Sequence, residues 1–118
     1  MATIKSYTDI EQSKKLAEIL PLESADMLYW AGEYITHPYM EGQHKDEQIP
    51  IWSLAALLEE IPEVINFDDD ENDYALEILK ESGLYYLFYE GKVEIDAQEN
   101  FVDACVAMIE KLHELKML

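Results

Sequence analysis

The residues most able to do chemistry form one acidic run that reads Asp68-Asp69-Asp70-Glu71-Asn72-Asp73. A calcium loop of the EF-hand type needs oxygen ligands at its positions 1, 3, 5 and 12 and a glycine at position 6. If the loop starts at Asp68, positions 3 and 5 fit but Leu79 falls at position 12. If it starts at Asp70, Glu81 reaches position 12 but Tyr74 falls at position 5. We interpret the run as a solvated turn, with Asp68, Asp70 and Asn72 as candidate ligands for adventitious divalent binding only.

Two histidines, His37 and His44, share a second polar segment with Asp46 and Glu47. A transition-metal site usually needs three or four converging ligands and supporting partners behind them. Two histidines seven residues apart in one loop do not meet that requirement. His37 and His44 are therefore candidate ligands, and the sequence predicts no metal centre.

Catalytic signatures are missing from the chain. Cys105 is the single cysteine, which allows no internal disulfide, and it falls on an apolar helical stripe where a buried hydrophobic role is expected. Four glycines assemble no phosphate-binding loop, and no arginine is present to hold a phosphate or carboxylate with two hydrogen bonds. Pairs such as Glu59 and Glu60 arise by chance among 26 acids. We predict no catalytic residue and no cofactor.

An aromatic run from Leu84 to Tyr89 is the remaining notable cluster. Its aromatic rings fit either the core of a sheet or a contact with a partner, because aromatic residues are enriched at the centres of interfaces. Both interpretations stay open here. The candidate interaction residues are Tyr85 and Tyr89, together with the acids of the run, Asp68, Asp69, Asp70, Glu71 and Asp73.

The charge of the chain restricts its partners. The 118 residues carry 26 acids and 8 lysines, so the formal net charge is −18. Binding nucleic acid directly, or an anionic membrane surface, requires a basic footprint that this chain lacks. Residues 46–118 hold 19 of the acids and four lysines, which predicts one acidic face built from the end of the second helix and the acidic run. The apolar content of 49% argues against disorder, and the length predicts a single domain over residues 1–118.

The elements in the first half of the chain follow from capping and punctuation signals. Thr8 and Glu11 resemble a capping box that starts a helix ending at Pro21. Short strands are expected over residues 27–30 and 33–36, followed by a loop over 37–48. A second helix arises from residues 49–58 with Ser53 as its N-cap, ends before Pro62 and is expected to lie on a sheet.

The second half of the chain is predicted to be a meander followed by a helix. Residues 74–80 suit either a strand or a short helix, and we favour the strand because strands are expected over 84–89 and 93–96 as well. Asn100 caps a C-terminal amphipathic helix with an apolar stripe. The prediction is an α+β fold, a small antiparallel β-sheet with about three helices packed on it.

Three segments of the chain resemble a known family. They are residues 17–27 (AEILPLESADM), residues 49–58 (IPIWSLAALL), and the helix segments 102–105 (VDAC) and 111–115 (KLHEL). These resemble small uncharacterised proteins from prophage and mobile-element regions of gut Bacteroidetes genomes, while residues 63–99 match only loosely. The resemblance implies a bacterial cytoplasmic setting and an unknown role, and it offers no catalytic residues to carry over.

Three functions are compatible with these observations. The first is a non-enzymatic protein-interaction module or accessory protein of a mobile element, with an unknown partner and a possible homodimer through an edge strand or the last helix. The second is an acidic mimic of nucleic acid that inhibits a basic host protein. The third is an enzyme with an unrecognised site. The N-terminal residues show no apolar signal segment, so we expect a cytoplasmic protein without a membrane anchor.

Overall fold

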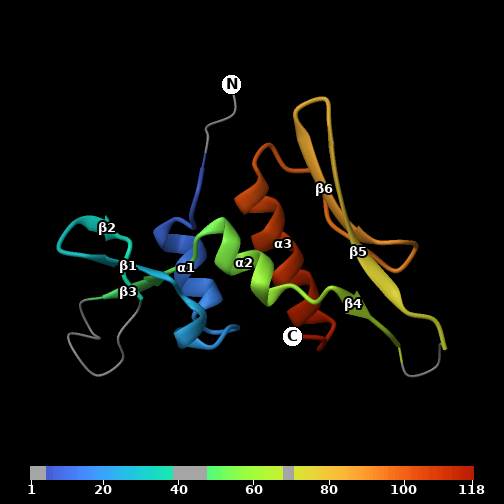
Figure 1. Cartoon of the computed structure of the whole chain (residues 1–118), viewed down its shortest axis with the longest axis horizontal. Coiled ribbons are helices and arrows are strands. Elements are labelled where there is room, and N and C mark those ends of the chain that lie inside the picture. Colours follow the sequence, from blue (N-terminus) through green and yellow to red (C-terminus); the bar gives the residue numbers. More distant parts are fainter. Residues whose placement is uncertain (1–4, 39–47, 68–70) are drawn as a thin grey trace.

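A computed structural model describes residues 5–38, 48–67 and 71–118 (Figure 1). The α+β class is confirmed, and the strands of the described residues form two antiparallel sheets instead of one. In chain order the elements are α1 (Ile10–Leu16), the 3₁₀ turn η1 (Leu22–Ser24), β1 (Met27–Trp30), β2 (Glu33–Ile35), β3 (Ile49–Ile51), α2 (Leu54–Glu60), β4 (Val64–Ile65), β5 (Tyr74–Glu81), β6 (Leu84–Tyr89), β7 (Val93–Glu94) and α3 (Phe101–Glu114).

Helix α1 begins one residue later than its sequence signals indicated. Asp9, and not Thr8, is the N-cap, and its carboxylate accepts the backbone N–H of Gln12 at 2.8 Å in a reciprocal capping box. The side chain of Thr8 is buried and accepts the backbone N–H of Trp52 at 3.2 Å. Both residues are good caps, and the contact with a distant segment decides between them. The helix ends at Leu16 and does not continue to the proline.

The first sheet has the order β2-β1-β3, and α1 lies against β3. Residues 49–51 form this edge strand, although the sequence suggested that they lead into the second helix. Pro50 stands opposite Leu28 in the ladder, a position that proline tolerates only in an edge strand. Ser53 is confirmed as the N-cap of α2, and that helix ends before Pro62 as predicted.

The second sheet has the order β4-β5-β6-β7 and confirms the strand predicted for residues 74–80. Strands β5 and β6 form a hairpin whose two-residue turn is Ser82-Gly83, with Glu81 facing Leu84. Both turn residues have positive φ, 53° and 78°, which matches the right-handed twist of the two strands. This turn fixes the register of the hairpin.

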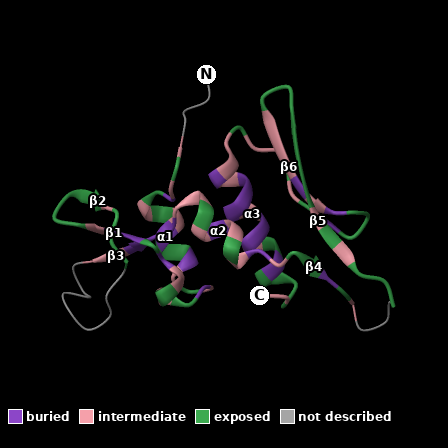
Figure 2. Ribbon diagram, in the orientation of Figure 1, coloured by how far each residue is buried: buried purple, intermediate pink, exposed green. Residues whose placement is uncertain are grey.

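Helix α3 occupies the middle of the molecule, between the two smaller helices and the second sheet (Figure 1). Asn100 is its N-cap, and its side chain accepts the backbone N–H of Asp103 at 2.8 Å, as predicted. Helix α2 packs on α3 and not on a sheet as we had expected. Much of α3 is buried (Figure 2), because it contacts both α2 and β6. Among the described residues, Met108 and Leu112 are completely buried there.

Within the described ranges, no helix is both long enough and apolar enough to cross a membrane.

Candidate functional site

The second sheet has two faces of different character. Residues paired across neighbouring strands of a sheet project to the same side, so the strand register assigns each side chain to a face. Leu87 and Tyr89 of β6, Ile65 of β4 and Val93 of β7 lie on the side of α3 and belong to the buried core. We call this side the inner face.

The opposite side, here called the outer face, carries apolar side chains from three strands. They are Val64 of β4, Ala75 and Leu79 of β5, and Leu84, Tyr86 and Phe88 of β6. None of them belongs to the buried core. Val64 and Leu79 are 48% and 46% exposed, and the three residues of β6 are partly exposed. Apolar side chains therefore gather on the outer face of the second sheet. Figure 1 shows this sheet beside α3.

Carboxylates border this apolar surface. Glu77 and Glu81 lie on the outer face of β5, and Glu94 lies opposite Phe88 on β7. All three are exposed. Beyond Glu94, a shallow groove of about 240 Å³ between β7 and α3 is lined by the further acids Asp96, Glu110 and Glu114 and by Lys111. The apolar surface thus has an acidic margin on both sides, which favours a partner of opposite charge.

The two tyrosines proposed from the sequence as interaction residues lie on the inner face. Tyr89 is fully buried, which corrects that prediction. Its hydroxyl donates a hydrogen bond to the backbone oxygen of Pro62 at 2.5 Å, and burial raises the pKa of Tyr89 to about 12. Tyr85 stacks on Phe101 of α3, with 5.1 Å between ring centroids. The Nζ of Lys80 lies over the ring of Tyr85, 5.3 Å from its centroid. Both rings fasten β6 to its neighbours.

The candidate interaction residues from the sequence include residues of β6 but not Tyr86 and Phe88, the partly exposed aromatic residues on its outer side. The run over β6 is apolar at every position, so it contains no alternation that would separate the faces. The signal lies in β5, where the odd-numbered residues include both Glu77 and Glu81. Because the two-residue turn pairs Glu81 with Leu84, the outward side of β5 predicts the outward side of β6.

Of the acidic run, the structure describes residues 71–73, which directly precede β5. Glu71 and Asp73 are exposed just before β5 begins. Asp68, Asp69 and Asp70 lie outside the described residues. Asn72 is exposed as well. The described part of the run adds negative charge to the end of β5 that borders Val64 and Ala75.

The remaining candidate residues do not converge on a site. His37 is exposed and its Nδ1 lies 3.0 Å from the backbone oxygen of Pro38, whereas His44 falls outside the described residues. Cys105 is buried as expected, and burial raises the pKa of its thiol to about 12. Across the ranges that the structure covers, no group of three or more histidine, cysteine or acidic side chains is arranged to hold a metal ion.

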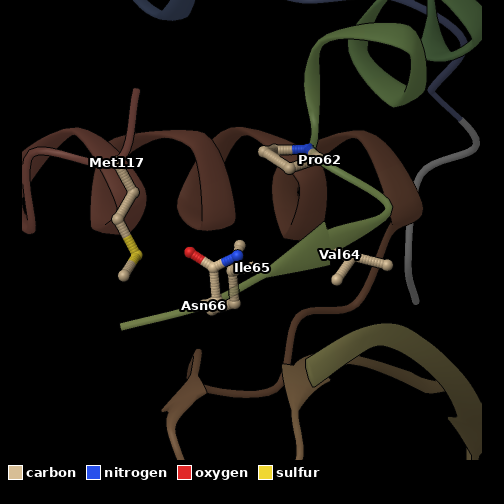
Figure 3. A pocket seen from close by; sticks show the side chains of 5 residues that line it. All are labelled: Pro62, Val64, Ile65, Asn66 and Met117. Atoms are coloured by element: carbon tan, nitrogen blue, oxygen red, sulfur yellow. The ribbon is translucent and has the colours of Figure 1, made fainter. Parts of the chain in front are cut away.

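A small hollow of about 250 Å³ lies beside β4 and is lined by Pro62, Val64, Ile65, Asn66 and Met117 (Figure 3). None of these side chains titrates near neutral pH, and Asn66 is the only one that carries polar atoms. The side chains that line the hollow therefore provide no group for acid–base chemistry.

An apolar surface with a charged margin is characteristic of protein–protein contact sites. Comparisons of this chain with protein families, with curated proteins and with solved structures found no match.

Proposed function

We propose that this protein is a non-enzymatic protein-interaction module that binds its partner through the outer face of the second sheet. The observation that carries the proposal is the uncovered apolar surface made by Leu79, Tyr86, Phe88 and their neighbours. A monomer that leaves large apolar side chains together on one sheet face loses the free energy of burying them. A partner that covers the face recovers it.

The partner that fits this surface is basic. Glu77, Glu81 and Glu94 surround the apolar side chains, and the chain as a whole has a net charge of −18. Such a field steers a positively charged protein toward the face and repels acidic proteins. The apolar centre then provides attraction that salt does not screen. Affinity is expected to fall with rising salt without disappearing.

The test is a capture experiment from cells of the native host with two matched variants. Leu79 and Leu115 are 46% and 43% exposed, but only Leu79 lies on the outer face. Leu79→Gln is expected to abolish capture of a basic protein, because it places a polar amide in the apolar centre. Leu115→Gln removes a leucine of equal exposure from the end of α3 and is expected to leave capture unchanged. Equal capture by both variants contradicts the proposal.

A second candidate function is an acidic mimic of nucleic acid that blocks a basic host protein. It is supported by the exposed carboxylates around the outer face and along the groove between β7 and α3. The capture experiment distinguishes this function from binding through the apolar outer face. Capture would be lost completely at high salt, would survive Leu79→Gln, and would weaken in Glu77→Gln combined with Glu94→Gln.

The cellular setting is also a proposal. We infer an accessory protein of a bacterial mobile element that acts in the cytoplasm, supported by the family resemblance of three segments and by a single cysteine. Detection of the protein in the soluble fraction of its host, with its gene inside an element that excises, tests this setting.

A further inference from the structure

The open edge of β5 is the backbone feature that the proposed function leaves unused. Strand β5 runs over Tyr74–Glu81, and β6 pairs with it from Leu76 to Glu81. On its other side β4, among the described strands, pairs with it only at Tyr74 and Ala75, and Leu76 N–H donates to Glu63 at 2.8 Å. From residue 77 to residue 81, that side of β5 has no strand beside it in the described part of the chain.

The direction of the backbone groups on this edge follows from the register. The pair that flanks a two-residue turn exchanges both of its hydrogen bonds, so the N–H and C=O of Glu81 point to β6. Directions alternate along a strand, and the bond from Leu76 to Glu63 confirms that the even residues point away from β6. The N–H and C=O groups of Ile78 and Lys80 therefore face the open edge.

This edge carries two exposed apolar side chains between its charged residues. Ile78 is 47% exposed and Leu79 is 46% exposed, on opposite faces of the sheet. A long edge with apolar side chains is a template for the addition of another strand. The backbone groups provide hydrogen bonds, and the side chains select the sequence that is added.

A second copy of this chain is a poor occupant. Each copy carries a charge of −18, and antiparallel pairing of two β5 strands centred on Leu79 brings Glu77 of one copy opposite Glu81 of the other. Like charges on neighbouring strands are destabilising. The same carboxylates attract lysine and arginine, so charge complementarity assigns the edge to a basic segment.

We propose that an extended segment of a basic partner adds to the open edge of β5 as an antiparallel strand. This inference rests on the proposed function and specifies how the partner binds. On the outer face, the added strand places a basic residue opposite Glu81, an apolar residue opposite Leu79 and a second basic residue opposite Glu77. Between them, a polar residue lies opposite Lys80 and an apolar residue opposite Ile78. The motif read along the partner is basic, polar, apolar, apolar, basic.

A peptide with this motif tests the inference without knowledge of the partner. The probe is the blocked peptide Lys-Lys-Thr-Val-Ile-Lys-Lys, and its control is Glu-Glu-Thr-Val-Ile-Glu-Glu. In amide NMR spectra of the full chain, the basic peptide is expected to shift the N–H signals of Ile78 and Lys80 and to slow their exchange with solvent. The N–H of Leu79 already bonds to β6, so its exchange is expected to change little. Absence of these effects, or equal effects of the acidic peptide, overturns the inference.

Two substitutions at one position separate strand addition from binding to the face. Ile78→Ala and Ile78→Pro remove the same side chain, but only proline removes the N–H that faces the open edge, a change that edge strands tolerate. We expect Ile78→Pro to weaken peptide binding about tenfold relative to Ile78→Ala, through one lost hydrogen bond and the proline ring in its place. Equal binding by the two variants refutes strand addition, and if Leu79→Gln still abolishes capture the proposed function stands without it.

Sedimentation of the protein without any partner completes the test. A monomer is expected, because the charge of each copy opposes pairing of two β5 edges. A dimer that Ile78→Pro dissociates and Ile78→Ala retains would assign the edge to a second copy and overturn the inference.

Discussion

The assignment of inner and outer faces makes a sharp prediction about two leucines. Leu87 of β6 is 1% exposed on the inner face, and Leu79 of β5 is 46% exposed on the outer face. Replacing either by alanine removes the same three carbons from neighbouring strands of one hairpin. The covalent change is therefore the same at both positions, and the difference in the free energy of unfolding reports mainly how far each side chain is buried and packed.

The expected magnitudes follow from that burial. At about 0.8 kcal/mol for each buried carbon, Leu87→Ala loses about 2.4 kcal/mol of transfer free energy, and the cavity under α3 raises the total to about 3 kcal/mol. Leu79 is already half in water, so Leu79→Ala loses about 1 kcal/mol and leaves no cavity. For a domain of this size, Leu87→Ala is expected to lower the Tm by about 10 °C.

Urea denaturation followed by fluorescence of the buried Trp52 measures both free energies of unfolding. The slope of the unfolding free energy against urea concentration should be unchanged, since neither substitution alters how much surface unfolding exposes. If Leu79→Ala costs as much as Leu87→Ala, the outer face is covered and the reasoning behind the candidate surface is refuted.

Three further predictions concern single groups. Tyr89→Phe removes the hydrogen bond to Pro62 and is expected to cost about 1–2 kcal/mol of unfolding free energy in the same urea assay, whereas no change would contradict the bond. Burial raises the pKa of Asp103, but its hydrogen bonds from Lys5, Gln12 and Asn100 and the charge of Lys5 outweigh burial and hold that pKa below its usual value. The pKa of Asp103 is thus lower in the folded than in the unfolded chain, so the stability that its ionised form contributes is complete above about pH 4 and is lost as the pH falls further. The urea midpoint of Asp103→Asn should therefore fall less on acidification than that of the unchanged protein. Burial of the Cys105 thiol should slow its reaction with a disulfide reagent at pH 8 on the order of a thousandfold relative to the unfolded chain, and a fast reaction would contradict its place in the core.

Local signals predicted the N-caps of two helices and the bounds of β1 and β6. Ser53 and Asn100 are the caps that the sequence indicated, and α2 ends before its proline. The failure at the first helix is instructive, because Thr8 and Asp9 are adjacent residues that can both cap a helix. The bond from Trp52 N–H to Thr8 selects Asp9, and that bond joins residues 44 positions apart in sequence.

Prediction of the candidate surface was limited by the pattern of β6. Tyr85 and Tyr86 are adjacent and equivalent as residue types, yet one stacks on Phe101 and the other lies on the outer face. A strand that is apolar at every position gives no period from which to assign a face. The alternation of polar and apolar residues in β5 shows which side of β6 faces outward only once the pairing of the two strands across the Ser82-Gly83 turn is known.

The sequence by itself determined the α+β class, the N-caps of α2 and α3, and the charge of −18 that favours a basic partner, because these depend on composition and on neighbouring residues. Tertiary structure decided which side of the second sheet α3 covers and how much of β5 has a strand on each side. Both choices depend on contacts between distant segments. The exposed surface of Leu79, Tyr86 and Phe88 is the result of that packing, since one helix can cover only one face of a sheet.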